Sequence, residues 1–361
     1  MSDIKTPVNR TKVRWLIAHH PVELFVRTAK AFVKKIEDLC PGQFEFEILT
    51  LSTYCEKYEN LYTKEQMDLW KTTTPRISGL ENPLRTTVLT STKQAATFTE
   101  INARWKMFFE AMKDGKFEMS QTQVSIVGSH LYSNYHAIDL PYIWNGHDHV
   151  STALDGEIGE RLGNAVGDAT GIRGLAFTYS GGYRIIGSTD GITSLNDLNN
   201  KKFITATATS GMLFDRAGVE RITRGLATAN DIGDMAEQGG AIETTYLRFE
   251  GKNILKTNHS MFMTAVLASD RFLNTLTEEQ RQSWKIATKA VAKLERIWSV
   301  EDAQKYEDEA VSRGVTIVEA SDEDKARLRE SAQTLYKAST LSHVGIDASL
   351  VGEIISMGKN T

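Results

Sequence analysis

Cysteine is scarce in this sequence, apolar runs are short, and basic residues are not in excess. Two cysteines among 361 residues exclude a disulfide scaffold and a thiolate zinc module. No apolar run approaches the roughly 18 residues that a membrane-spanning helix needs, and the longest, Met261 to Ala268, has the length of one buried strand. With 42 Lys and Arg against 46 Asp and Glu, the net charge of −4 argues against a nucleic-acid binder.

The length indicates the number of domains, and the first residues leave the cellular location open. A chain of 361 residues, 41% of them hydrophobic, is long enough for two domains with substantial cores. The polar start, residues 1–12, lacks the apolar core of a secretory signal, which fits a cytoplasmic protein or an exported one without its signal. Cys40 and Cys55 could pair only in an exported protein, and we expect two buried free thiols.

The first half opens with a pattern typical of a parallel sheet. Residues 13–18 read as a buried strand, Pro21 suits a first helical turn, and apolar residues then recur at helical spacing to Leu39. The alternation in residues 44–48 predicts a second strand, which completes a βαβ unit. All six prolines lie at or before Pro141, so the second half is built differently.

The second half carries one very long predicted helix. Thr277 and Gln280 form a capping-box pattern, and apolar residues step by three and four behind it, beginning with Trp284. If unbroken to Gly314, this helix is about 54 Å long, so we expect it to run along both domains. Further upstream, Asn230 is expected to cap a helix that ends at Gln238.

A set of short motifs occurs in a characteristic order from the middle of the chain onward. They are Asp114–Met119, Asp139-Leu140-Pro141-Tyr142, Leu154-Asp155-Gly156, Gly174–Phe177, Gly182-Tyr183-Arg184, Ser194–Lys202, Gly240-Ala241-Ile242-Glu243 and Lys256-Thr257-Asn258-His259. Each motif is weak alone, but their order and spacing together are specific. With them the chain resembles the extracytoplasmic solute-binding proteins of TRAP (tripartite ATP-independent periplasmic) transporters, of the DctP type.

The resemblance implies an α/β, two-lobed periplasmic-binding-protein fold, with mixed sheets flanked by helices and a ligand cleft between the lobes. Lobe I would comprise residues 1–181 and 263–302, and lobe II residues 182–262 and 303–361. The protein would capture a small organic solute, a carboxylate or a zwitterion, and deliver it to the membrane subunits of a TRAP transporter. It would be a periplasmic monomer without its signal peptide, would bind no metal or cofactor, and would not be an enzyme.

Two departures from the family pattern bear on the ligand. Ile204 stands where the family usually has an arginine that pairs with a substrate carboxylate, so the site should be less cationic. Arg216, Arg221, Arg224 or Arg248 could supply the missing cation, and the sequence leaves open which. Residues 51–100 are also longer than the usual link, which predicts an insertion in lobe I.

Seven residues are candidates for contact with the ligand. Arg184 matches a family arginine near the ligand, and a guanidinium suits carboxylate recognition because it offers planar paired donors. The others lie at expected strand ends or helix starts, where open α/β folds place ligands. They are His19, His20, Gln121, Thr122, Asn230 and Tyr246.

Other functions remain open at this stage. A metal site at His147 and His149 is disfavoured, because side chains two apart on a helix diverge, and a helix start capped by Asp148 explains them better. The same fold could serve as the ligand-sensing subunit of a membrane receptor. A hydrolase or lyase that uses the histidines is a third interpretation, although no catalytic signature supports it.

Overall fold

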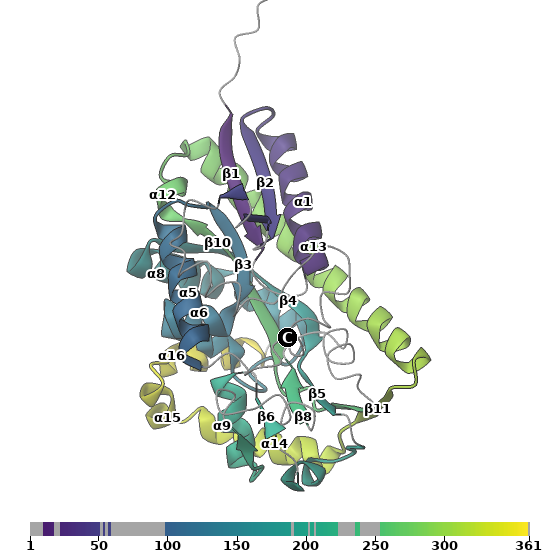
Figure 1. Cartoon of the computed structure of the whole chain (residues 1–361). Coiled ribbons are helices and arrows are strands. Elements are labelled where there is room, and N and C mark those ends of the chain that lie inside the picture. The colour runs from purple at the N-terminus through teal and green to yellow at the C-terminus, as the bar shows by residue number, and fades with distance from the viewer. Residues whose placement is uncertain are drawn as a thin grey trace, which may run out of the picture.

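The computed structural model has two main sheets, each covered by helices, joined by crossing strands and one long helix (Figure 1). It describes residues 10–17, 22–50, 53–54, 57–58, 98–188, 191–200, 203–205, 207–222, 235–238 and 253–359. Nearly all of the expected insertion at 51–100 lies outside these residues.

The first sheet, sheet A, has five strands of mixed direction in the order β2-β1-β3-β10-β4. β1 pairs in parallel with β2 and β3, which confirms the βαβ opening, whereas β10 runs antiparallel to β3 and β4. The strands are β1 (Thr11–Ile17), β2 (Phe44–Thr50), β3 (Met119–Gln123), β4 (Ile172–Tyr183) and β10 (Met261–Ser269).

Helices α1 (Val22–Leu39) and α13 (Glu278–Ser312) cover one face of sheet A. The apolar stripe of α1 packs on alternate residues of β1, and Phe32 meets the rings of Trp15 and Trp284 at 5.3 and 5.1 Å. α13 begins with the predicted capping box of Thr277 and Gln280. Short helix α12 (Asp270–Leu273) joins β10 to α13.

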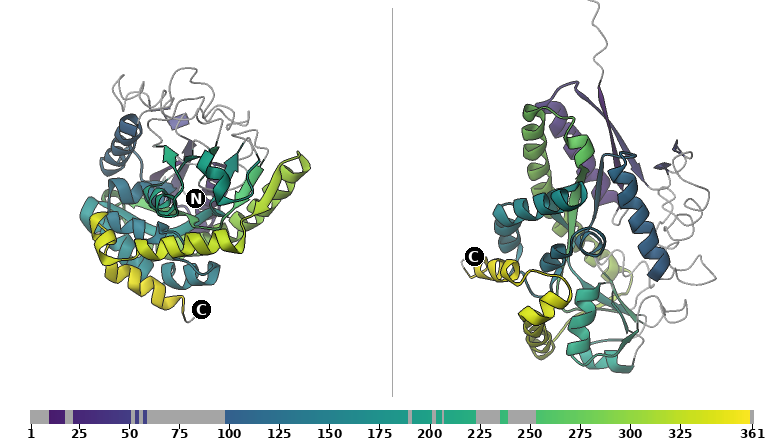
Figure 2. Two further views of the ribbon diagram at one scale, coloured as in Figure 1. Left: turned by 90° about the horizontal axis from the view of Figure 1, so that it is seen from below. Right: turned by 90° about the vertical axis from the view of Figure 1, so that its left-hand side faces the viewer.

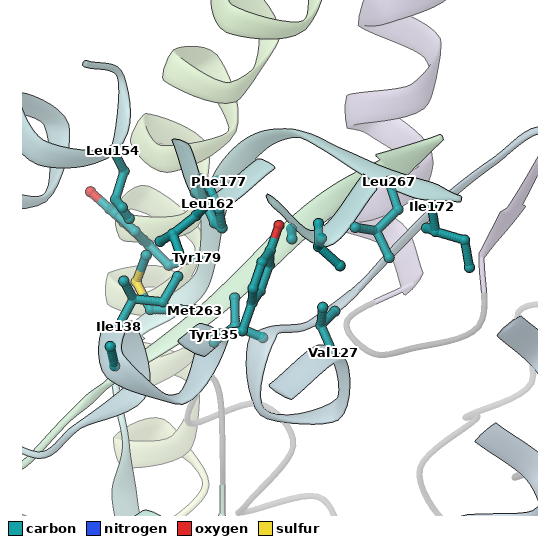
Figure 3. Close-up of a cluster of buried hydrophobic side chains, with 14 of the residues drawn as sticks. Val127, Tyr135, Ile138, Leu154, Leu162, Ile172, Phe177, Tyr179, Met263 and Leu267 are labelled. Carbon is teal, nitrogen blue, oxygen red and sulfur yellow. The ribbon is translucent and has the colours of Figure 1, made fainter. Parts of the chain in front are cut away.

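The other face of sheet A carries the larger core cluster. Tyr135, Phe177 and Leu162 come from a 3-10 turn, a strand and a helix, and lie together in this core (Figure 3). The covering elements are α5 (Phe98–Lys113), α6 (Val124–His130), η2 (Ser133–Asp139), α7 (His147–Leu154) and α8 (Glu157–Thr170). Residues 147–170 form two helices rather than one, since the chain turns at Asp155 and Gly156.

The second sheet, sheet B, has the order β11-β9-β5-β8, with a small separate β6-β7 pair beside it. Its apolar core contains Ile186, Phe203, Phe214 and Leu328, so strands and helices of this half share one interior. The elements are β5 (Ile185–Ser188), β6 (Phe203–Ile204), β7 (Arg221–Ile222), β8 (Met235–Gln238), β9 (Asn253–Lys256), β11 (Thr316–Glu319), η3 (Leu195–Asn200), α9 (Ala208–Arg216) and α14 (Asp322–Leu335).

The chain crosses between the two sheets at three places. β4 leads into β5 through Arg184, and β9 leads into β10 through residues 257–260. α13 begins beside α1 and ends beside β11, which confirms the prediction of one long helix that spans both halves (Figures 1 and 2). Within the described part of the chain, no helix is long and apolar enough to cross a bilayer.

Two local expectations differ from the structure. Residues 235–238 form strand β8 rather than the end of a helix, because they pair antiparallel with β5, and that pairing overrides their helix propensity. The cap of α7 is Gly146, and Asp148 lies within the first turn.

The end of the chain returns to sheet A. After α15 (Ala338–His343), helix α16 (Ala348–Met357) packs against α7, and Leu350 and Ile354 belong to the larger core of sheet A. We expected residues 303–361 in the second lobe, so this last helix is placed differently. The remaining lobe boundaries stay a prediction.

Candidate functional site

Arg184 lies at the first crossing between the two sheets. It follows β4 and precedes β5, and its side chain is fully buried. Its backbone nitrogen donates to the carbonyl oxygen of Ser260 at 2.7 Å, which joins the first crossing to the second. The best sequence candidate for ligand contact is therefore held where both halves of the protein meet.

Asp139 links the guanidinium of Arg184 to the second half of the molecule. Arg184 Nη2 donates to Asp139 Oδ1 at 3.0 Å, and Thr209 Oγ1, in the first turn of α9, donates to Asp139 Oδ2 at 3.0 Å. All three side chains are almost fully buried. Phe262 lies with its ring centroid 5.0 Å from Arg184 Cζ, a cation–π contact with the guanidinium.

Two nitrogens of Arg184 have no acceptor among the residues that the structure describes. Nε and Nη1 are buried and have no hydrogen-bond partner among the described residues, and the same holds for the hydroxyls of Ser180 and Ser260. Buried donors without acceptors are rare because they forfeit hydration without compensation. The crossing therefore has unmet capacity to donate to an oxygen-rich group.

The second crossing has an unusual backbone that Tyr142 holds in place. Tyr142 and Asn258 adopt φ angles of +57° and +51°, a left-handed conformation that costs side-chain-bearing residues energy. The Tyr142 amide donates to the carbonyl of His259 at 2.6 Å, and its hydroxyl donates to the carbonyl of Thr257 at 2.9 Å. The segment 139–142 thus contacts both crossings, the first through Asp139 and the second through Tyr142.

Gln121 lies under the long helix and contacts a buried acid. Its Nε2 donates to both carboxyl oxygens of Glu295 on α13, at 2.7 and 2.8 Å. Burial raises the pKa of Glu295 to about 7, although hydrogen bonds from Gln121 and Thr178 act in the opposite direction. The amide nitrogen of Gln121 is therefore engaged in this structure, and the contact of Gln121 with a ligand stays a prediction.

Three further polar candidates are described: Thr122 as a ligand contact, and His147 and His149 as metal ligands. Thr122 is fully buried on β3, and its Oγ1 has no partner among the described residues. His149 Nε2 contacts the carbonyl of Ile354 at 2.8 Å, so this ring joins α7 to α16. Burial lowers the pKa of His147, whose ring lies 5.1 Å from that of Tyr179. No metal-ligand cluster occurs in the described ranges.

Several predicted positions lie outside the described residues. They are His19, His20, Asn230, Tyr246, Cys55, Arg224 and Arg248. Nothing is described of the side chains of Ile204 and Arg221, whereas Arg216 is exposed and donates to Thr340 at 3.4 Å. Cys40 is a buried free thiol, as expected.

Sequence reasoning overlooked three residues of this site. Asp139 stood in the quoted Asp-Leu-Pro-Tyr motif, but nothing local marked it as the partner of Arg184. Thr209 and Phe262 carry no sequence signal, because Thr209 reaches Asp139 and Phe262 reaches Arg184 only when α9 and β10 are in place.

A comparison with family models decides the family. The model described as DctP, bacterial extracellular solute-binding protein, family 7, matches residues 104–222 and 241–342, more than half of the chain. This chain belongs to that family. The match confirms the resemblance and makes the protein a solute-binding protein of an extracellular family rather than an enzyme. A search of curated proteins gives no match.

Solved structures share the fold at low sequence identity. A TRAP periplasmic solute-binding protein from Ochrobactrum anthropi is 17% identical, with a TM-score of 0.71 over 98% of this chain and 96% of that one. One from Xanthobacter autotrophicus is 18% identical, with a TM-score of 0.68 over 96% and 99%. The sugar acid binding protein from Advenella mimigardefordensis is 17% identical, with a TM-score of 0.70 over 98% and 99%. These likenesses confirm the two-lobed α/β fold.

Proposed function

We propose that the protein captures a small organic acid between its two lobes, with the carboxylate bound at Arg184, and delivers it to the membrane subunits of a TRAP transporter. The observation that carries the proposal is the buried guanidinium of Arg184, which is held by Asp139 and has Nε and Nη1 without an acceptor among the described residues. A carboxylate is the natural acceptor, because charge-assisted hydrogen bonds to a guanidinium are strong.

The net charge around Arg184 limits what the ligand can be. Asp139 already balances the guanidinium, so a bound carboxylate adds a second negative charge beside one arginine. With Ile204 in place of the usual second arginine, neutral donors must supply the remaining hydrogen bonds. The hydroxyls of Ser180 and Ser260 are buried and have no hydrogen-bond partner among the described residues, which favours a polyhydroxy acid over a compact dianion.

The acids bound by structural neighbours support this ligand class. The Xanthobacter protein has bound β-D-galacturonate, the Advenella protein is in complex with galactonate, and a protein from Shewanella oneidensis has bound succinate. Each of these ligands carries a carboxylate, and the two sugar acids add several hydroxyls.

The hinge would be formed by the crossings already described. Residues 184 and 257–260 join the two sheets, and α13 runs beside both, so rotation about these segments would close the lobes over a ligand. The other candidates, His19, His20, Gln121, Thr122, Asn230 and Tyr246, stay predicted contacts. Periplasmic localisation after removal of a signal peptide completes the proposal, and the genomic sequence upstream of residue 1 tests it.

Calorimetric titration with galacturonate, galactonate and succinate tests the ligand class, with neutral galactose as the matched control. We expect at least one sugar acid to bind and galactose not to bind. Equal affinity for galactose would contradict a role for Arg184 in carboxylate recognition. Delivery is tested by measuring uptake of the labelled acid into cells that carry the membrane subunits of the TRAP transporter. The uptake is compared with and without this protein.

A further inference from the structure

Helices α14 and α16 connect the two halves of the protein once more. α14 belongs to the core of the second half through Leu328 and Leu335. α16 belongs to the larger core of sheet A through Leu350 and Ile354. The chain between these helices therefore passes from one half to the other (Figure 1). Detachment of α16 from sheet A would remove this connection.

His149 on α7 is a buried side chain that contacts α16. It is 2% exposed, and its Nε2 lies 2.8 Å from the carbonyl oxygen of Ile354. The backbone nitrogen of Asn145 donates to Nδ1 of the same ring at 3.2 Å. The ring also meets that of Trp144, with the centroids 4.9 Å apart. His149 thus joins the start of α7 to the last turn of α16.

The two hydrogen bonds determine which form of the His149 ring fits. The amide of Asn145 can only donate, so Nδ1 must keep its lone pair, and the carbonyl of Ile354 can only accept, so Nε2 must carry the hydrogen. A protonated ring would set a second donor against the Asn145 amide and lose that bond. Because His149 lies in the first turn of α7, the added charge would also lie at the positive end of the helix dipole.

The surroundings of His149 favour the neutral ring. Burial lowers the pKa of His149, although the hydrogen bond to Ile354 acts in the opposite direction. A lowered pKa means that the docked helix binds the proton less readily than a detached one does. The attachment of α16 should therefore weaken as pH falls below about 6.5, the usual pKa of an accessible histidine.

Other charged or titratable groups lie on the elements around the ring. They are His147 and Asp148 on α7, Glu157, Glu160, Arg161 and Asp168 on α8, and Asp347, Glu353 and Lys359 on or beside α16. Within the described residues, no hydrogen bond or ion pair joins any of them to His149. Carboxylates titrate at about pH 4, and lysine and arginine above about pH 10. Near pH 6.5 this leaves the two histidines, and the ring of His147 contacts β4.

We propose that His149 is a proton-controlled latch for α16, which holds the helix on sheet A while the ring is neutral and loosens it when the ring is protonated. The latch rests on two hydrogen bonds that a charged ring cannot make together. It concerns the conformation of the chain and involves no ligand. The latch and the solute-binding proposal can therefore fail independently.

Hydrogen exchange of the α16 amides between pH 7.5 and pH 5 tests the latch. The rates are corrected for the intrinsic pH dependence of exchange, and the amides of β10, in the middle of sheet A, are the internal reference. We expect the protection of α16 to fall below about pH 6.5 while β10 stays protected. Because loosening takes up one proton at His149, the fall should not exceed about tenfold per pH unit.

His149→Gln tests whether this residue carries the effect. Glutamine does not titrate and has an amide that can donate to the carbonyl of Ile354, so the protection of α16 should be equal at pH 7.5 and pH 5. His343→Gln is the matched control, because His343 is exposed on the adjacent helix α15. His136→Gln and His147→Gln change two further histidines of the first half. All three controls should keep the wild-type fall.

NMR titration of the His149 ring in the wild type needs no variant. The neutral ring should carry its hydrogen on Nε2, and its pKa should lie below 6.5. A neutral ring with hydrogen on Nδ1, or a pKa at or above 6.5, would overturn the latch. So would wild-type protection of α16 that is unchanged between pH 7.5 and pH 5, or a His149→Gln protein that keeps the fall.

Discussion

Asp139 and Arg184 form a fully buried ion pair, with 3.0 Å between Oδ1 and Nη2, at the junction of the two halves of the protein. Asp139 uses its second oxygen to accept from Thr209 on α9, so one carboxylate holds both the arginine and the second half. A buried ion pair contributes little to stability by itself, because desolvation offsets the attraction. It holds in place a guanidinium of which two nitrogens have no acceptor in the described part of the chain.

Loss of the guanidinium should abolish most of the solute affinity. Removing a buried charged partner costs about 2–5 kcal/mol in binding, so Arg184→Ala should weaken binding of a sugar acid by a factor of about 30 or more. Calorimetry measures the change. Arg184→Lys keeps the charge without the planar donors and should recover only part of the affinity. An unchanged affinity in Arg184→Ala would make the residue structural.

Asp139→Asn should destabilise the unliganded protein. It leaves the Arg184 charge buried without a counter-ion, at a cost of about 3–5 kcal/mol in the free energy of unfolding. The double variant Asp139→Asn with Arg184→Met should lose less than the sum of the two single losses, because the uncompensated charge is gone. Urea unfolding of the four proteins measures this coupling, and strictly additive losses would show that the pair acts independently.

The buried acid Glu295 should make stability depend on pH. Its pKa is about 7 in the folded protein, above the unfolded value near 4.3, so the folded state binds the extra proton between these values. The free energy of unfolding should therefore fall as pH rises from about 4.5 to 7, with this group contributing a loss of about 3 kcal/mol.

Glu295→Gln should flatten that part of the pH profile, since it removes the titrating group. Urea unfolding at closely spaced pH values measures the slope, and Glu279→Gln, an exposed residue of the same helix, is the control that should keep the wild-type slope. A Glu295→Gln profile that is parallel to the wild type would contradict the assignment.

Helix α8 approaches strand β4 so closely that adding one methyl group between them should lower the free energy of unfolding. A Cβ added at Gly163 would lie 2.2 Å from the carbonyl oxygen of Gly174, so Gly163→Ala should destabilise the protein by about 1–3 kcal/mol. Gly352 on α16 has open space around it, so Gly352→Ala should instead stabilise by about 0.5–1 kcal/mol. Thermal unfolding measures both, and the same sign for the two variants would refute the packing argument.

Local signals predicted the elements whose structure depends on nearby residues. The capping box and the stripe behind Thr277 predicted α13, and the periodicity to Leu39 predicted α1, because both patterns act within a few helical turns. The prediction for residues 230–238 was wrong at 235–238, since the pairing of β8 with β5 depends on a strand some fifty residues away.

For the site, the sequence by itself determined only the candidates, and the family motif made Arg184 the first of them as a predicted ligand contact. Only the tertiary structure decided which side chains contact Arg184 and which candidate is bonded elsewhere. It brought Asp139 and Phe262 to the guanidinium and Thr209 to Asp139, from three distant segments, and it joined Gln121 to Glu295. Such contacts cannot be inferred from one chain read in order, because hydrogen bonds and ion pairs depend on distance in space and not on separation along the sequence.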